Sequence, residues 1–160
     1  MPERKVDMRF EIDAPIETVW QILTDLEGYP RWNPFVVQAR SQKSGDTVGA
    51  MMTLSVRWRD GSTTTSTEEV IEVHAPGQQD TGTWSAEWVY SFRSWMSTIA
   101  MIRSVRTQKL VQIPDGPTEY ISQIHLSGWG AGGAPLSKIK AGIEDQALAL
   151  KESSESVSRS

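Results

Sequence analysis

The spacing of apolar residues divides the chain into three regions with different periodicities. Residues 5–12 alternate between apolar and polar side chains, as a strand with one buried face does. Residues 13–25 change to the spacing of an amphipathic helix, with an apolar stripe made by Ile16, Val19, Trp20 and Leu23. Gly28 and Pro30 then interrupt the pattern, so we expect a second, shorter helical segment after the first.

From residue 35 to residue 129 the pattern is that of strands joined by tight turns. β-branched and aromatic residues are frequent, and turn signals such as Asp60-Gly61 separate the runs. Residues 93–102 are apolar without a clear period, so they either extend a strand or form a short flap. We expect about six strands, over residues 35–41, 47–58, 63–74, 82–92, 103–113 and 118–129.

The end of the chain returns to helical spacing. Residues 135–152 predict a long helix whose apolar stripe should be buried against the sheet, and this stripe contains Leu136, Ile139, Ile143, Ala147 and Leu150. Residues 153–160 are polar and are expected to form a flexible tail. Residues 1–152 then make a single α+β domain, in which a curved antiparallel sheet wraps around one helix and tends to leave a cavity.

Composition narrows the possible partners and cofactors. The formal net charge is -4, and the basic residues form no cluster, so we expect no nucleic-acid partner. Cysteine is absent, and His74 and His125 lie far apart in the sequence, so we expect no metal site. The segment GWGAGGA at residues 128–134 lacks the lysine and hydroxyl residue of a phosphate-binding loop, and we interpret it as a hinge. We therefore expect no cofactor.

The hydrophobic segments are too short to cross a membrane, and the first residues lack the apolar centre of a signal peptide. We expect a cytoplasmic protein, monomeric or homodimeric, that does not insert into membranes. The unusual feature is the number of tryptophans, 7 in 160 residues. Such an excess indicates either a crowded core or an aromatic-lined cavity for a hydrophobic small molecule.

Residues 10–36, FEIDAPIETVWQILTDLEGYPRWNPFV, carry a family resemblance. A strand followed by A-P-x-E-x-V-W and then D-x-x-x-Y-x-x-W-N-P resembles the N-terminal motif of the START-like, or SRPBCC, superfamily. The resemblance extends over residues 5–152. It implies a helix-grip fold: a curved seven-stranded antiparallel sheet around a long C-terminal helix, with two short helices after the first strand and a deep hydrophobic pocket. Tyr29, Trp32 and Phe35 would then pack where the short helices meet the sheet.

Within this superfamily the chain most resembles the polyketide cyclase/dehydrase branch, whose members usually work without cofactor or metal. This resemblance implies a cyclase, or cyclase/dehydratase, acting on a hydrophobic polyketide-like or terpenoid-like intermediate of natural-product biosynthesis. The alternative is a carrier or receptor that binds a hydrophobic small molecule or lipid and performs no chemistry. An enzyme needs one or two polar groups inside the pocket, whereas a carrier needs only an apolar wall.

Tyr90 and His125 are the first candidates for such polar groups. Tyr90 lies on an aromatic strand face with Trp88 and Phe92. It either donates its hydroxyl to a substrate carbonyl or is a core tyrosine bonded to the backbone. His125 is a candidate acid–base group because imidazole titrates near neutral pH. The pattern does not decide whether the face of His125 or the opposite face, with Tyr120, lines the cavity.

Arginine and glutamate supply the remaining candidates. Arg103 and Arg106 are separated by an odd number of positions, so they cannot share a strand face. One of the two is expected to reach the pocket and bind a carboxylate or enolate, and we take Arg103 as the candidate. Glu69 is the carboxylate considered as a buried base. The expected substrate-binding residues are mostly aromatic: Trp32, Asn33, Trp58, Trp88, Phe92, Tyr120 and Ile143.

Overall fold

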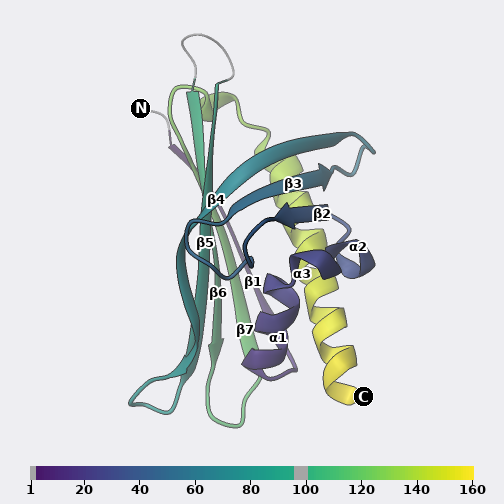
Figure 1. Cartoon of the computed structure of the whole chain (residues 1–160), viewed down its shortest axis with the longest axis vertical. Coiled ribbons are helices and arrows are strands. Elements are labelled where there is room, and N and C mark those ends of the chain that lie inside the picture. The colour runs from purple at the N-terminus through teal and green to yellow at the C-terminus, as the bar shows by residue number, and fades with distance from the viewer. Residues whose placement is uncertain (1–2, 96–100) are drawn as a thin grey trace.

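A computed structural model describes residues 3–95 and 101–160 of the protein (Figure 1). Its strands are β1 Glu3–Ile12, β2 Val36–Ser41, β3 Met51–Arg57, β4 Thr63–Gln78, β5 Trp84–Trp95, β6 Met101–Gln112 and β7 Thr118–Ser127. Its helices are α1 Ile16–Thr24, α2 Tyr29–Trp32 and α3 Leu136–Arg159, with single 3-10 turns η1 Leu26–Gly28 and η2 Ala131–Gly133.

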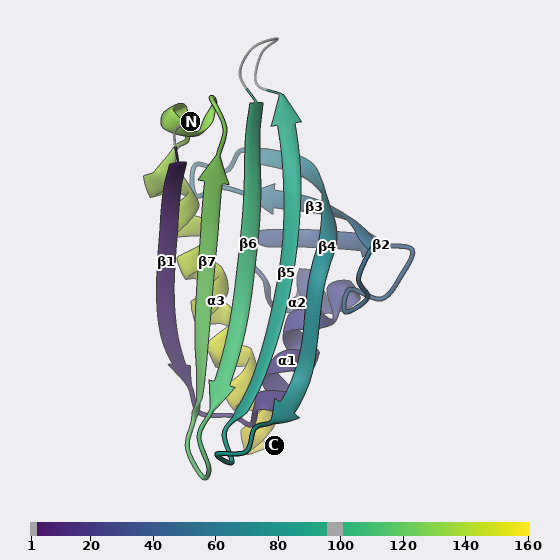
Figure 2. The same ribbon diagram turned by 90° about the vertical axis from the view of Figure 1, so that its left-hand side faces the viewer.

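The described strands form one antiparallel sheet in the order β1-β7-β6-β5-β4-β3-β2 (Figure 2). From β2 to β7 each strand pairs with the next in sequence, and β1 joins the sheet by pairing with β7. The sheet curves around α3, which lies along its concave side together with α1 and α2 (Figure 1). This arrangement confirms the predicted helix-grip fold, in which a curved seven-stranded sheet holds a long C-terminal helix.

The long strand β4 belongs to two different ladders. Its residues Thr63–Glu69 pair with β3, whereas residues Glu69–Gln78 pair with β5. Register shifts on both sides of Val73 let the strand bend, because a bulge increases local bend and twist. Beyond Ser91, the described part of β5 pairs only with β6. The β3–β4 hairpin therefore swings away from β5 (Figure 1), and the sheet opens where the two strands separate.

The segment between α1 and β2 closes one part of the core. Tyr29 is buried and donates its hydroxyl proton to the carbonyl of Leu23, which holds α2 against the end of α1. The Asn33 side-chain oxygen accepts the backbone N–H groups of Phe35 at 3.0 Å and of Val36 at 2.9 Å. These contacts explain why so many aromatic residues occur in a segment interrupted by proline and glycine. Their side chains fill the space between the short helices and the sheet.

Gly142 lets the ring of Phe35 pack directly on the backbone of α3. A Cβ atom at residue 142 would lie 2.1 Å from Cε1 of Phe35, a distance that no side chain tolerates. The next residue, Ile143, is fully buried. At this point of α3 a position without a side chain therefore lies next to one with a large buried side chain, and Ala147 and Leu150 continue the buried face of the helix.

The C-terminal part of α3 corrects one prediction. Residues 153–160 were expected to form a flexible polar tail, but the helix continues to Arg159. Glu155 accepts the backbone N–H of Asp13 at 2.9 Å, Lys151 donates to the carbonyl of Glu11 at 2.9 Å, and Ser154 is fully buried. Contacts with the end of β1 therefore hold residues whose composition alone indicates disorder.

The apolar stretch 93–102 is partly described. β5 continues to Trp95 and β6 begins at Met101, so the strands extend into this stretch from both sides. Residues 96–100, to which the alternative of a flap also applied, lie outside the described residues.

Candidate functional site

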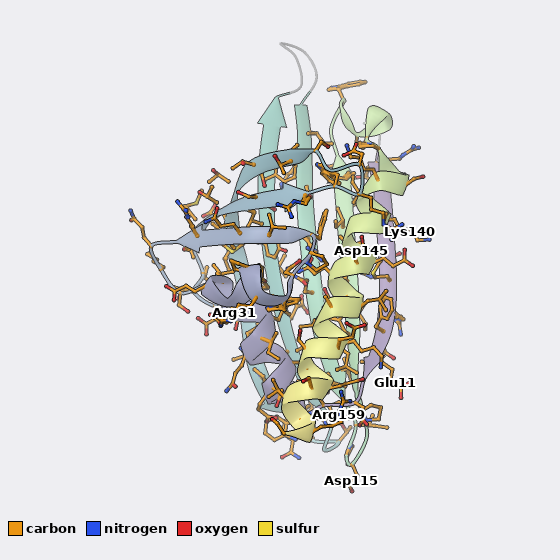
Figure 3. All side chains as sticks on the ribbon, turned by 90° about the vertical axis from the view of Figure 1, so that its right-hand side faces the viewer. Glu11, Arg31, Asp115, Lys140, Asp145 and Arg159 are labelled. Atoms are coloured by element: carbon orange, nitrogen blue, oxygen red, sulfur yellow. The ribbon has the colours of Figure 1, made fainter. Side chains whose placement is uncertain are left out.

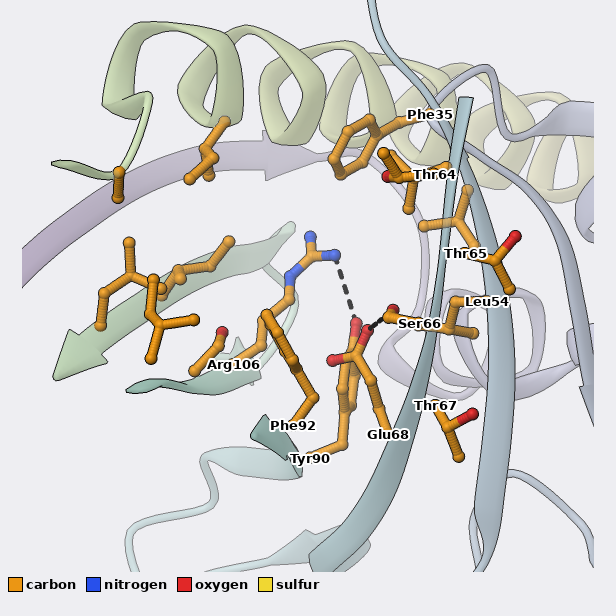
Figure 4. A pocket seen from close by; sticks show the side chains of 18 of the residues that line it. Phe35, Leu54, Thr64, Thr65, Ser66, Thr67, Glu68, Tyr90, Phe92 and Arg106 are labelled. Carbon is orange, nitrogen blue, oxygen red and sulfur yellow. Dashed lines mark hydrogen bonds between the residues drawn. The ribbon is translucent and has the colours of Figure 1, made fainter. Parts of the chain in front are cut away.

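A cavity of about 540 Å³ lies between the concave face of the sheet and the first turns of α3 (Figure 4). This volume is within the range of small-molecule sites, about 300 to 1,000 Å³. Most of the wall is apolar, with aromatic rings from three different segments of the chain. The apolar lining residues are Phe35, Val36, Leu54, Val56, Trp58, Phe92, Ile102, Ile124, Leu126, Ala134, Pro135 and Ile139.

The cavity has an outer end and an inner end that differ in exposure. At the outer end the exposed residues Thr64, Thr65, Thr67 and Pro135 line the cavity where β4 leaves β5. At the inner end the lining polar residues are buried, and they comprise Glu68, Tyr90, Ser104 and Arg106. A ligand that enters between β4 and α3 would therefore reach the buried polar residues only at the inner end, when the rest of the molecule is enclosed by the apolar wall.

Tyr90 has a hydroxyl group whose oxygen already accepts two hydrogen bonds. Nη1 of Arg106 donates to it at 3.2 Å and Nε2 of Gln108 donates to it at 3.0 Å. The Tyr90 hydroxyl donates no hydrogen bond to another described residue, so its proton is available to a ligand. Burial is the main cause that raises the pKa of Tyr90 above its ordinary value, which keeps the phenol neutral and able to donate.

Arg106 is a buried cation at the inner end, with only 5% of its surface exposed. Its Nη2 donates to the Ser122 hydroxyl at 3.3 Å, and its Nε has no hydrogen-bond partner among the described residues. The ion pairs formed by residues 3–95 and 101–160 do not include Arg106. Figure 4 shows its guanidinium group pointing into the cavity toward the Tyr90 hydroxyl.

Glu68 supplies a carboxyl group to the same cavity. The residue is 8% exposed, and its Oε2 accepts a hydrogen bond from the Ser66 hydroxyl at 2.9 Å. Burial raises the pKa of Glu68, while the Ser66 bond and the charge of Arg106 act in the opposite direction. The carboxyl is therefore easier to protonate than an exposed glutamate, and its ionised form is a stronger base.

A set of buried hydrogen bonds behind the cavity holds Tyr90 in place. Gln108 is fully buried, and its Oε1 accepts the hydroxyl proton of Tyr120 while its Nε2 donates to Tyr90. The chain has 3 tyrosines, and burial is the main cause that raises the pKa of each of them: Tyr29, Tyr90 and Tyr120. The inner end thus contains neutral phenols arranged around one buried cation.

Three of the predicted catalytic residues lie on the other side of the sheet. His125 is exposed, with its ring 3.7 Å from the Glu3 carboxylate on β1, and Arg103 and Glu69 are also exposed. The prediction that these residues reach the pocket is wrong. On β6 and β7 the residues that line the cavity are even-numbered, and on β4 the carboxylate that lines it is Glu68. Arg106 takes the place expected for Arg103, and Glu68 takes the place expected for Glu69.

The predicted substrate-binding residues divide into two groups. Trp58 and Phe92 line the cavity with Tyr90, as expected. The others lie outside its lining and pack around it: the Trp88 indole donates to the carbonyl of Gly45 at 2.8 Å, and Trp32 packs edge-on against the ring of Tyr29. The remaining members of this second group, all buried, are Asn33, Tyr120 and Ile143.

Residues that sequence reasoning missed are mostly polar residues of β4 and β6. Ser66 and Glu68 are close to a run of threonines that indicates a solvated strand, and Arg106 was considered only as an alternative to Arg103. The register of the β6–β7 hairpin was the available signal. Arg106 lies opposite Ile124, and Arg103 lies opposite Ser127. Counting back from the turn at Pro114-Asp115-Gly116 places Arg106 on the face of Tyr120.

Two further properties bear on what the site holds. In the described part of the chain, no group of three or more histidine, aspartate or glutamate side chains is arranged to bind a metal ion. No described helix is both long enough and apolar enough to span a bilayer. The buried polar residues that line the inner end are Arg106, Tyr90, Glu68 and Ser104, and the first three carry the ionisable groups.

The fold and the cavity define a helix-grip protein with an internal small-molecule cavity. A family profile described as "Polyketide cyclase / dehydrase and lipid transport" matches residues 3–152. The chain therefore belongs to this polyketide cyclase/dehydrase and lipid transport family, as its N-terminal motif suggested. In the comparison with curated proteins, no protein matched the chain.

Solved structures with the same fold include biosynthetic proteins and a plant protein. The di-domain ARO/CYC BexL from the BE-7585A biosynthetic pathway is similar with a TM-score of 0.65 and 13% identity, over 99% of this chain and 50% of that one. The di-domain ARO/CYC StfQ from the steffimycin biosynthetic pathway is similar with a TM-score of 0.67 and 8% identity, over 99% of this chain and 53% of that one. The chain spans about half the length of these two proteins. The major latex-like protein 151 of Panax ginseng is similar with a TM-score of 0.62 and 10% identity, over 98% of this chain and 97% of that one. At these identities the likeness shows a common fold.

Proposed function

We propose that the protein is a cofactor-independent cyclase, or cyclase/dehydratase, for a hydrophobic polyketide-like or terpenoid-like intermediate of natural-product biosynthesis. The observation that carries this proposal is the inner end of the cavity, where the ionisable groups of Arg106, Tyr90 and Glu68 adjoin a mostly apolar wall. A carrier for lipid needs only the apolar wall. Family membership and the fold shared with two di-domain ARO/CYC proteins support the proposal.

In this proposal the apolar wall folds the substrate. A flexible poly-β-ketone chain in water rarely brings the two reacting carbons together. Confinement between Phe35 and Trp58 on one side and Phe92 on the other restricts the chain to few conformations. Such positioning lowers the activation barrier by several kcal/mol, because an oriented intramolecular reaction avoids the entropy cost of encounter. The largest reduction of this kind is about 7 to 11 kcal/mol.

The chemistry then uses the three polar residues. The Glu68 carboxylate removes a proton from a methylene group between two carbonyls, and the electron pair moves into an enolate. The enolate oxygen accepts hydrogen bonds from Arg106 and Tyr90, which stabilise its charge in a site with little water. The enolate carbon bonds to a carbonyl carbon further along the chain, and the resulting alkoxide takes the proton from Glu68. No oxidant, reductant or metal is needed in this aldol step.

Dehydration would use the same groups. Glu68 removes a second proton from the new ring, the electron pair forms a double bond, and the hydroxyl group leaves as water with the proton that Glu68 returns. A carboxyl with a raised pKa suits both directions, because it is a stronger base than an ordinary carboxylate and stays protonated at higher pH. This dual role requires that Glu68 remain inside the cavity.

The test is turnover of a synthetic linear poly-β-ketone thioester, followed by liquid chromatography and mass spectrometry. We expect one cyclised product, formed faster than in buffer, with part of it lighter by one water. Tyr90→Phe should lower the rate by about 100- to 1000-fold, the usual cost of one missing oxyanion donor. His125→Ala, on the outer face of the sheet, is the matched control and should keep full turnover. Equal rates and products with and without the protein would contradict the proposal and leave the carrier function.

A further inference from the structure

In the part of the chain that the structure describes, the buried guanidinium of Arg106 forms no ion pair with an acidic side chain. Burying an ionised side chain costs several kcal/mol unless an opposite charge and hydrogen bonds compensate. The described residues give Arg106 two neutral partners, the hydroxyls of Tyr90 and Ser122, at 3.2 and 3.3 Å. Both distances are long for a charged donor, whose hydrogen bonds to anions are usually about 2.7 to 2.9 Å. The guanidinium is therefore held in place but not neutralised.

Glu68 does not supply the missing charge. Its carboxyl accepts a hydrogen bond from Ser66, and it forms no ion pair with Arg106. The other ionisable groups whose charges act on this part of the cavity are the phenols of Tyr29, Tyr90 and Tyr120, which are neutral.

The donors that remain unused point to the shape of the missing partner. Among residues 3–95 and 101–160 the Tyr90 proton has no hydrogen-bond acceptor, and the two bonds of Arg106 leave its Nε and further N–H groups without one. Both residues line the cavity, and Figure 4 shows the guanidinium and the phenol oxygen together at the inner end. Planar guanidinium groups bind best to a pair of oxygens that share one negative charge.

We infer that the inner end of the cavity binds a singly charged, two-oxygen anion: the ligand is an apolar molecule that ends in a carboxylate or in the enolate of a 1,3-dicarbonyl group. Arg106 neutralises the charge, and Tyr90 donates to one oxygen. The inference rests on the proposed function in using the same cavity, and it specifies the class of substrate. A neutral lipid or sterol would leave Arg106 unpaired, and a phosphate monoester carries more charge than one cation balances.

The experiment compares three compounds with the same aromatic body. They are 2-naphthoate, which has the carboxylate, 1-(2-naphthyl)butane-1,3-dione, which has the enolisable diketone, and 2-acetylnaphthalene, which has one neutral carbonyl. Binding to the whole protein is measured by isothermal titration and by the absorption spectrum of the diketone. Because a hydrogen bond to a charged group contributes about 1.5 to 3 kcal/mol, we expect an anion to bind about 10- to 150-fold more tightly than the ketone.

The two anionic compounds distinguish the possible sources of the anion. Tight binding of the naphthoate indicates an acid as the natural ligand. Tight binding of the diketone, with its absorption shifted to that of the enolate below the pH at which it ionises in buffer, indicates a 1,3-dicarbonyl intermediate. Arg106→Gln should remove the preference for anions, and Arg106→Lys, which keeps the charge without the planar fork, should retain part of it. Arg103→Gln, on the outer face of the same strand, is the matched control and should behave as the parent protein.

Equal affinity for all three compounds would overturn the inference, and so would an anion preference that survives in Arg106→Gln. Neither result bears on the turnover of a poly-β-ketone, which tests the proposed function separately. Conversely, anion binding that depends on Arg106 together with no turnover would support the inference and contradict the cyclase. Failure of all three compounds to bind would contradict both, because the cavity would then accept no apolar body of this size.

Discussion

The inner and outer ends of the cavity are both stabilised by polar contacts, but the contacts differ in kind. At the inner end, Gln108 joins the hydroxyls of Tyr90 and Tyr120, and all three side chains are buried. At the outer end, the turn after β3 is tied to α3 by exposed ion pairs. Arg59 donates two hydrogen bonds, at 3.0 and 2.8 Å, to Asp145, which is labelled on α3 in Figure 3.

A second ion pair and one aromatic contact complete the outer end. Lys138 lies 3.2 Å from the Asp60 carboxylate, and its ammonium group lies 5.0 Å from the ring centre of Trp58. Water and salt compete with such exposed contacts, whereas nothing replaces a buried hydrogen bond that is lost. The inner end therefore sets the geometry of the site through buried bonds, while at the outer end exposed contacts tie the β3–β4 hairpin to α3.

Removing the buried amide of Gln108 should have the largest effect on stability. Gln108→Leu has a similar volume but leaves the Tyr120 proton without an acceptor and Tyr90 with one donor fewer. We expect a loss of about 2 to 4 kcal/mol in the free energy of unfolding, measured with urea. Thr65→Val at the exposed outer end should change it by less than about 0.5 kcal/mol. Similar losses for the two variants would remove the distinction between the ends.

The substitution Gly142→Ala should have the next largest effect on stability. Alanine normally stabilises a helix relative to glycine by about 1 kcal/mol. Here the new methyl group would meet the ring of Phe35, so we expect a net loss of about 1 to 3 kcal/mol and a displaced cavity wall. Gly133→Ala is the control, since no atom lies within 4 Å of a Cβ placed there. A Gly142→Ala protein as stable as the parent would show that Phe35 does not pack on α3.

The stability of the protein should fall as the pH rises above 4.5, because burial raises the pKa of the Glu68 carboxyl. Between the ordinary pKa of 4.5 and the higher folded-state pKa of Glu68, the folded protein holds a proton that the unfolded chain has lost. Stability contributed by this group should therefore be present below 4.5 and should fall as the pH rises through the folded-state pKa. Thermal melts over this window should show a decline that Glu68→Gln removes and that Glu69→Gln, at the exposed neighbour, leaves unchanged. A decline that persists in Glu68→Gln would assign it to another group.

The smallest effect on stability is expected at the outer end. Arg59→Gln removes the contact with Asp145, and we expect little change in the melting temperature because exposed ion pairs contribute little. The release of a bound naphthyl compound should nevertheless become faster, and the difference from the parent should shrink as salt is added. Stopped-flow fluorescence would measure both. Release rates that are identical at low salt would show that this ion pair does not fasten the hairpin.

Periodicity predicted the fold well but placed only part of the site. The strands and α3 have apolar residues at regular spacing, because one face of each is buried. The two faces of β7 are less distinct, since Ile121 on the outer face is half-buried and Ile124 on the inner face is buried. The pattern therefore could not decide between His125 and its neighbours. On β4, the inner face carries Ser66 and Glu68 because it lines a cavity, so its polarity is that of a solvated strand.

The end of α3 was missed for a different physical reason. Residues 153–159 are polar except for Val157, and no apolar stripe marks them as part of a helix. Their order comes from contacts with a segment near the start of the chain, such as the bond between Glu155 and the backbone of Asp13. Such long-range contacts leave no periodic signal. The same holds for Gly142, whose role follows only from the approach of Phe35.

The central claim is that the inner end of the cavity, through Arg106 and Tyr90, holds the reacting oxygens of an apolar substrate. A crystal structure of the protein with 1-(2-naphthyl)butane-1,3-dione tests it most directly. The account predicts the two oxygens within hydrogen-bonding distance of the Arg106 guanidinium and the Tyr90 hydroxyl, with the naphthyl ring against Phe35 and Trp58. Oxygens bound at the outer end beside Thr64 and Thr67, with Arg106 left unpaired, would contradict it.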